Sequence, residues 1–294
     1  MIKQNPFSIY DFLGYFIPGA LVIYIIVLLV TITDFTNLNT ILSTLSNDKS
    51  FQLDSFLFFV IISYAVGHLI NFLSSITIER YSNWKYNYPS KYLMNLKPNH
   101  KFWIGKKKII FWKILLLLLI FPVSVFDYLF GEVLSFKTFY TKKADNYIIE
   151  TVKTKGIILL NQLGTPITKT LREYDFHRIF SHYVYENSKN HQSRLTNYVA
   201  LYGFLRSLCL ISVFMFWLLI YRIYIKAELT ITFKEFFDKS KYIIFAMVLI
   251  SLASYIFFMA FMKFYRRYTL ESLMLIVIDK KLVDNTQKRK RMEE

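Results

Sequence analysis

One line of polar residues within an apolar stretch has a spacing that could support chemistry. Its members follow one another at intervals of three or four residues, and they are Tyr64, His68, Asn71, Ser75 and Glu79. These intervals place side chains on one face of an α-helix. In a membrane helix, such a polar line either hydrogen-bonds helices together or borders a hydrated path or a subunit interface around a pore. Both interpretations stay open here, and Gly67 would allow a second helix to approach closely.

Three charged residues near the ends of apolar stretches could form ion pairs at the membrane interface. Asp11 begins the first apolar stretch, and Arg206 or Arg80 from the same leaflet would be its partner. Asp11 also has a structural interpretation. An acid three residues after Ser8, in the first turn of a helix, suits a capping box and the helix dipole.

A second group of residues has a spacing that could bind a metal ion. Glu173, His177, His182 and Glu186 form two Glu/His pairs, each four residues apart, as metal ligands on a helix face can be. The two histidines, however, would lie about 140° apart around a helix, so we expect no metal site. The chain also lacks a phosphate-binding glycine loop, a nucleophile elbow and a recognisable pair of catalytic carboxylates. We therefore expect neither a catalytic site nor a cofactor.

The composition indicates the class of protein in which these residues lie. Of the 294 residues, 54% are hydrophobic, and the mean hydropathy is +0.34. These values exclude a disordered chain and an ordinary soluble enzyme. The single cysteine, Cys209, excludes an intrachain disulfide and a small secreted disulfide scaffold. The sequence thus predicts an all-α integral membrane protein, because backbone groups in lipid must be satisfied within helices.

Four apolar stretches are long enough to cross a bilayer as helices, which requires about 20 residues each. They cover about 12–33, 55–78, 206–225 and 242–262. Most Lys and Arg residues lie in 79–205 and 263–294, so the positive-inside rule places these segments and both termini in the cytoplasm. The predicted organisation is an N-terminal pair of spans (1–78), a basic helical insert (79–205), a C-terminal pair of spans (206–262) and a basic helix and tail (263–294).

A fifth apolar run, about 109–126, interrupts the insert. If it crossed the membrane, more Lys and Arg residues would lie outside the cell than inside, against the positive-inside rule. We therefore expect a re-entrant or in-plane helix that Pro122 breaks, and a true crossing is the alternative. Basic residues beside this helix and after the last span are expected to contact lipid headgroups. They are Lys106, Lys107, Lys108, Arg266 and Arg267.

Within the insert, one helix is predicted from the spacing of its apolar residues. Phe176, Phe180, Tyr183 and Val184 recur at i, i+4, i+7 and i+8, which places them on one face. The insert is also basic and rich in aromatic residues, and the net charge of the chain is +16. Lys, Tyr and Trp suit a juxtamembrane belt, so we expect anionic lipids and not nucleic acid as the partner of these charges.

Several short motifs resemble those of uncharacterised multispanning bacterial membrane proteins. They are Asp11-x-x-Gly14-Tyr15-x-x-Pro18-Gly19, Gly67-His68, Arg206, and Tyr265-Arg266-Arg267-Tyr268-x-x-Glu271. Some of those proteins resemble effectors of anti-phage systems, in which a cytoplasmic sensor triggers loss of inner-membrane integrity. The resemblance implies a defence role for this chain and transfers no activity to a particular residue.

Three hypotheses about function follow. The first is a self-associating effector of the bacterial inner membrane that perturbs or permeabilises the bilayer when a cytoplasmic ligand or protein binds. The second is a non-conducting anchor or scaffold for a cytoplasmic partner complex. The third is a membrane enzyme that acts on lipid headgroups through Glu173, His177 or His182.

Overall fold

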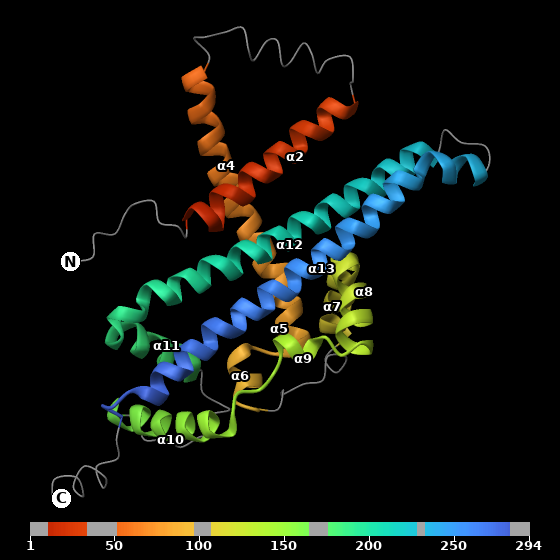
Figure 1. The fold of residues 1–294 in the computed structure, drawn as a ribbon. Coiled ribbons are helices and arrows are strands. Elements are labelled where there is room, and N and C mark those ends of the chain that lie inside the picture. Colours follow the sequence, from red (N-terminus) through yellow and green to blue (C-terminus); the bar gives the residue numbers. More distant parts are fainter. Residues whose placement is uncertain (1–10, 34–51, 97–106, 165–175, 228–232, 283–294) are drawn as a thin grey trace, which may run out of the picture. The chain divides into compact units, whose positions relative to one another are not determined.

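The computed structural model describes residues 11–33, 52–96, 107–164, 176–227 and 233–282. Regular structure in these ranges is entirely helical, as the sequence predicted (Figure 1). The elements, in chain order, are η1 (Phe12–Phe16), α2 (Ile17–Thr33), α4 (Gln52–Ser74), η2 (Ser75–Glu79), α5 (Arg80–Tyr86), α6 (Pro89–Leu93), α7 (Lys107–Leu119), α8 (Phe121–Phe126), η3 (Asp127–Val133), α9 (Lys137–Tyr140), α10 (Asn146–Gln162), α11 (Phe176–Asn187), η4 (Lys189–His191), α12 (Gln192–Ala227) and α13 (Phe233–Ile278).

Three of these helical stretches are long and apolar enough to cross a bilayer, which indicates a membrane protein. They are Phe56–Leu93, Lys189–Tyr224 and Ser240–Ile278. They contain three of the four predicted spans. The fourth predicted span, 12–33, is helical as η1 and α2, but its described apolar part, Phe12–Val27, is shorter than the other three.

The apolar run at 109–126 is a broken helix. α7 and the helix that follows it, Phe121–Val133, meet at an angle of 95°. Pro122, in the first turn of α8, has no N–H to donate to the preceding turn. Two carbonyl groups at the break are satisfied by side chains. The Trp217 indole donates to the Leu119 carbonyl at 2.7 Å, and the Ser124 hydroxyl donates to the Leu117 carbonyl at 3.3 Å.

The chain divides into two compact units. The first unit comprises Met1–Tyr81, Trp112–Leu129 and Ala200–Phe261, and the second comprises Ser82–Phe111, Phe130–Val199 and Met262–Glu294. α12 and α13 contribute residues to both. These helices have 36 and 46 residues, about 54 and 69 Å at 1.5 Å per residue. Both are longer than the roughly 30 Å of a hydrocarbon core, and both extend beyond the predicted spans.

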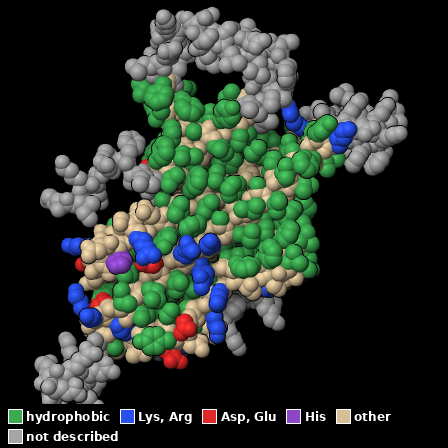
Figure 2. All heavy atoms as spheres, viewed as in Figure 1, with side chains coloured by type: hydrophobic (Ala, Val, Ile, Leu, Met, Phe, Trp, Pro, Cys, Tyr) green, Lys and Arg blue, Asp and Glu red, His purple; other side chains and the backbone are tan. Residues whose placement is uncertain are grey.

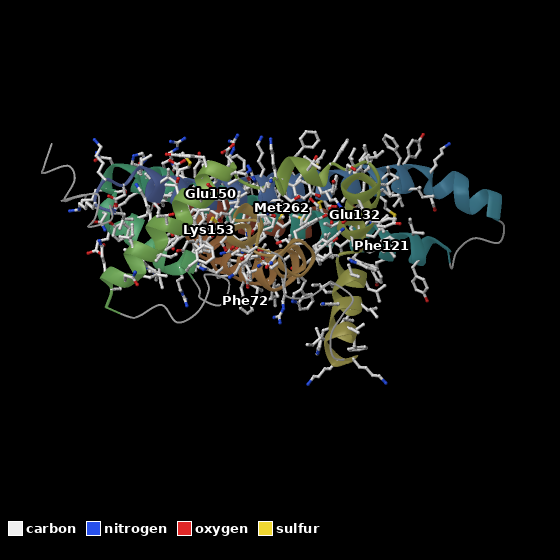
Figure 3. The ribbon with its side chains drawn as sticks, turned by 90° about the horizontal axis from the view of Figure 1, so that it is seen from below. Phe72, Phe121, Glu132, Glu150, Lys153 and Met262 are labelled. Atoms are coloured by element: carbon white, nitrogen blue, oxygen red, sulfur yellow. The ribbon has the colours of Figure 1, made fainter. Side chains whose placement is uncertain are left out.

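Much of the first unit's surface is apolar. Large side chains on α4 face outward, among them Phe56, Leu57, Phe58, Ile61, Leu69 and Phe72. Phe72 points away from the ribbon in Figure 3, and hydrophobic side chains cover the visible face of α2 and α4 in Figure 2. An exposed apolar surface of this extent is typical of contact with lipid or with another protein.

The second unit has an apolar core of its own. It includes Leu93, Met94, Ile149, Val152, Leu159, Phe176, Phe180, Val184, Leu273 and Ile276, which come from α6, α10, α11 and α13. The helix predicted from the spacing of Phe176, Phe180 and Val184 is therefore confirmed as α11, with all three side chains buried.

Polar contacts hold the C-terminal end of α13 in the second unit. The Lys155 ammonium group donates to the carbonyls of Val277 and Asp279, at 2.6 and 2.7 Å. The Tyr183 hydroxyl donates to the Asp279 carboxylate at 2.7 Å. Burial and the neighbouring carboxylate raise the pKa of Tyr183 well above its usual value, since both disfavour a phenolate. These contacts satisfy carbonyl groups that the end of a helix leaves open.

Candidate functional site

The site begins with a close crossing of two helices in the first unit. Gly19 of α2 lies against Ser63 of α4, and Gly67 of α4 lies against Tyr15 of η1. A Cβ atom on Gly67 would be only 1.8 Å from the Tyr15 carbonyl oxygen. A Cβ atom on Gly19 would be only 1.7 Å from the Ser63 carbonyl oxygen. Only glycine permits backbones to approach this closely. The crossing fixes α4 against the N-terminal helix.

The crossing also positions the first two residues of the predicted polar line, Tyr64 and His68, against the N-terminal helix. The His68 ring stacks on Tyr15, with centroids 3.8 Å apart, and meets the edge of Tyr64 at 4.6 Å. His68 remains exposed, and Tyr64 is half-buried. Contact between these aromatic rings joins η1 to α4.

A π-turn sets the directions of the side chains at the C-terminal end of the polar line. Residues Ser75–Glu79 form η2, in which i→i+5 hydrogen bonds replace the α-helical i→i+4 pattern. In an α-helix, Glu79 would be displaced by about 80° from Asn71 around the axis. The additional residue in the turn reduces this displacement, so Ser74 and Glu79, five residues apart, face the same way as Asn71.

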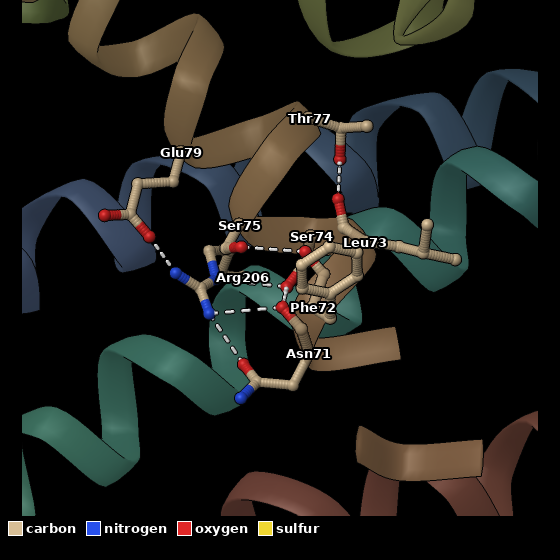
Figure 4. A network of polar contacts seen from close by, with 8 residues as sticks. All are labelled: Asn71, Phe72, Leu73, Ser74, Ser75, Thr77, Glu79 and Arg206. Carbon is tan, nitrogen blue, oxygen red and sulfur yellow. Dashed lines mark hydrogen bonds and ion pairs between the residues drawn. The ribbon is translucent and has the colours of Figure 1, made fainter. Parts of the chain in front are cut away.

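Arg206 of α12 binds this face of α4 and η2 (Figure 4). Its Nε donates to the Ser74 hydroxyl at 3.0 Å, and one Nη donates to the Asn71 side-chain oxygen at 2.6 Å. The other Nη forms an ion pair and hydrogen bond with the Glu79 carboxylate. We name these four residues, Arg206, Asn71, Ser74 and Glu79, the Arg206 clasp.

Arg206 and Ser74 are buried, whereas Asn71 and Glu79 are half-buried. Only 7% of Arg206 is exposed. The Ser74 hydroxyl accepts from Arg206 and donates to the Asn71 carbonyl at 2.8 Å. A buried guanidinium is tolerated when a carboxylate neutralises it and its remaining N–H groups find acceptors. The clasp provides both, and it ties α12 to α4 within the first unit.

The structure thus divides the predicted line between two contacts. Tyr64 and His68 pack on Tyr15, whereas Asn71 and Glu79 bind Arg206. Ser75 takes a different role, since its hydroxyl donates to the Phe72 carbonyl of its own helix at 2.7 Å. The clasp uses Ser74, which the predicted line passed over for Ser75 although it lies three residues after Asn71 and on the same helix face.

The three predicted ion-pair candidates have different surroundings. Arg206 pairs with Glu79, which the sequence placed in the polar line. Asp11 precedes η1 with helical dihedral angles, and its side chain makes no capping hydrogen bond. Ser8, its expected partner in a capping box, lies outside the described residues, so the capping role of Asp11 stays a prediction. Arg80 is exposed at the start of α5. An ion pair between Asp11 and either arginine stays a prediction.

A second buried polar contact in the first unit was not predicted. Asp127, at the start of η3, is fully buried and accepts a hydrogen bond from the Tyr81 hydroxyl at 2.7 Å. Lys113 of α7 is also buried, with 6% exposure. The sequence did contain an indication of their burial. Lys113 lies inside an apolar run and Asp127 directly after it, and charged residues at such positions usually face protein and not lipid.

The predicted headgroup-contacting residues lie at two places. Lys107 and Lys108 are exposed at the start of α7, and Lys106 lies outside the described residues. Arg266 donates through Nε to the Lys142 carbonyl at 2.9 Å, whereas Arg267 is exposed and lies over the Phe264 ring. Contact of these residues with lipid stays a prediction.

The part of the chain that the structure describes contains no group of three or more His, Cys, Asp or Glu side chains able to hold a metal ion. His177 and His182 lie on α11, and His177 meets the Tyr268 ring edge. Glu173 lies outside the described residues. No protein-family model, curated protein or solved structure matches the chain.

Proposed function

We propose that this protein is an effector of the bacterial inner membrane that perturbs or permeabilises the bilayer under control from the cytoplasm. Four membrane helices and a re-entrant helix at 109–126 would anchor it, with both termini in the cytoplasm. Copies of the chain would associate through the exposed apolar surface of the first unit. A protein or small molecule that binds the cytoplasmic part would act as the signal. The resemblance implies that this response serves anti-phage defence.

The Arg206 clasp is the observation that carries this proposal. An arginine within an apolar helix is costly to place in a membrane and generally marks a functional position. A helix that only anchors a protein would gain from an apolar residue there, because buried ion pairs add little stability over apolar side chains of similar volume. We infer that the clasp holds α4 and α12 in a closed state, and that the signal opens it.

Opening would change the environment of the polar line. Once Arg206 leaves Asn71 and Glu79, α4 would carry unsatisfied polar groups in an apolar surrounding, which favours water or another copy of the line as a partner. A hydrated path between associated copies would then conduct ions. One local ion pair would thereby control the permeability of the membrane.

The test is membrane potential in bacteria during induced expression of the full chain. Glu79→Gln removes the ion pair with little change in volume, so we expect it to depolarise the membrane more than the unaltered chain at equal membrane abundance. Ser75→Ala is the matched control, since its hydroxyl bonds only its own helix. Equal potentials for Glu79→Gln, Ser75→Ala and the unaltered chain would refute the gating role.

A non-conducting scaffold is the second candidate function. The observation in its favour is that Tyr64, His68, Asn71 and Glu79 all contact residues of their own chain. In this case the clasp only joins helices. Glu79→Gln would then lower stability and leave the membrane potential unchanged.

A further inference from the structure

A basic cleft in the second unit lies apart from the Arg206 clasp. It has a volume of about 560 Å³ and lies between the segment that precedes α10 and the side of α13. Three cationic side chains line it, Lys142, Lys143 and Arg266, together with one carboxylate, Asp145. The formal charge of its lining is therefore 3 − 1 = +2. Asp145 is the N-cap residue of α10. Its carboxylate accepts a hydrogen bond from the Tyr147 backbone N–H at 2.8 Å.

The three cations are available to a ligand. Among the described residues, none of them has an acidic side chain within ion-pair distance. The hydrogen bond from Arg266 Nε to the Lys142 carbonyl fixes the guanidinium and leaves both Nη atoms without a bond to a described residue. A guanidinium held in this way can offer two parallel N–H donors to a phosphate group.

The residues that precede the cleft in the chain are apolar and exposed. Val133, Leu134 and Phe139 have exposed fractions of 63%, 55% and 75%, and the rings of Phe136 and Phe139 meet edge to face with centroids 5.9 Å apart. Apolar and aromatic side chains followed within a few residues by lysines are typical of a segment at a membrane interface. A soluble phosphate compound would not need such a segment, whereas a lipid has an acyl part that these side chains can contact.

We propose that the cleft binds the phosphate headgroup of an anionic phospholipid, with Arg266, Lys142 and Lys143 on the phosphate and Val133–Phe139 in contact with the acyl region. This site rests on the membrane location included in the proposed function and is independent of the Arg206 clasp. Failure of the depolarisation experiment would therefore leave it intact.

The test uses the full chain reconstituted in phosphatidylcholine bilayers that contain a spin-labelled phosphatidylglycerol. The immobilised fraction of the label gives the relative affinity for the anionic lipid. The double variant Lys142→Gln, Arg266→Gln should lower this affinity about tenfold, because each basic residue near a membrane surface contributes measurably to binding of anionic lipid. Arg266→Lys keeps the charge but loses the paired donors, so it should give an intermediate loss.

The matched control removes two charges from elsewhere in the second unit. Lys153 lies on α10 beside Glu150 (Figure 3), and Arg178 is exposed on α11. The variant Lys153→Gln, Arg178→Gln should keep its affinity for phosphatidylglycerol within about twofold. If both double variants lost the same affinity for phosphatidylglycerol, general attraction between opposite charges would explain the binding, and the proposed site would be wrong.

Excess inorganic phosphate distinguishes the lipid from a soluble ligand. We expect phosphatidylglycerol to remain bound in its presence, because the lipid also contacts the apolar segment. Complete displacement by phosphate would overturn the lipid assignment and identify a soluble phosphate compound as the ligand. A neutral label, spin-labelled phosphatidylcholine, should show the same mobility with every variant.

Discussion

Arg206 is a buried cation of the first unit, and its partners explain how the fold accommodates it. A lone buried guanidinium is destabilising, but Glu79 neutralises its charge and Ser74 and Asn71 accept its remaining hydrogen bonds. Removal of one partner leaves the other charge buried and uncompensated. Loss of one charge of this pair should therefore lower the stability of the first unit more than loss of both charges together.

This dependence gives a prediction for a double-mutant cycle. Arg206→Met should lower the free energy of unfolding by about 3 kcal/mol, because it leaves the Glu79 carboxylate without its counter-charge. Adding Glu79→Leu should recover a large part of that loss. Denaturant titration of the purified full chain in detergent would measure both changes. Losses that simply add in the double variant would show that the two side chains do not interact in the folded protein.

At the scale of elements, two departures from regular helix packing build the site. The π-turn η2 changes the direction of Glu79, and the glycine contacts at Gly19 and Gly67 bring α2 and η1 onto α4. π-turns occur mostly as single turns within α-helices and are frequent at functional positions. Here the π-turn allows three residues of one helix to face the same arginine.

The glycine crossing gives a second prediction. Gly67→Ala would place a Cβ atom 1.8 Å from the Tyr15 carbonyl oxygen. Because the clashing atom belongs to the backbone, the helices must separate, and we expect a loss of about 1–3 kcal/mol in stability. Thermal unfolding of the purified variant in detergent would measure it.

Gly14→Ala is the control for that substitution. Gly14 is buried in η1, but an added Cβ would meet no atom within 4 Å. The control should retain its melting temperature or raise it, since alanine favours a helix more than glycine does. Comparable losses from both substitutions would show that close approach of the helices is not the reason for Gly67.

At the scale of the whole molecule, the path of the chain through the membrane depends on the broken helix at 109–126. The break at Leu119–Phe121 gives α7 and the following helix different directions. A re-entrant helix would return the chain to the side from which it entered, so that residues before α7 and after η3 share one side of the membrane. A complete crossing would separate them.

Cysteine labelling in intact cells decides between these paths. In a Cys209→Ser background, we expect Lys108→Cys and Tyr147→Cys, the latter exposed on α10, to be equally protected from a membrane-impermeant reagent added outside, and both to react after permeabilisation. Lys280→Cys, exposed after the end of α13, should behave in the same way if the C-terminus is cytoplasmic. Labelling of Tyr147→Cys from outside, with Lys108→Cys protected, would establish a crossing and reverse the predicted side of the residues that follow η3.

The sequence by itself determined the helical class and the approximate positions of the three helices that are long and apolar enough to cross a membrane, because these depend on the length and periodicity of local apolar runs. It also located the break beside Pro122 and the buried face of α11. It identified Arg206, Asn71 and Glu79 as separate candidates, but not as one site.

Only the tertiary structure decided which side chains meet. Arg206 lies 127 residues from Glu79 and 135 from Asn71 in the chain, so their contact depends on how α12 packs against α4. The direction of Glu79 depends on a π-turn, which the 3.6-residue period of an ideal helix does not reveal. Local patterns set where helices form, whereas long-range packing sets which of their polar groups pair.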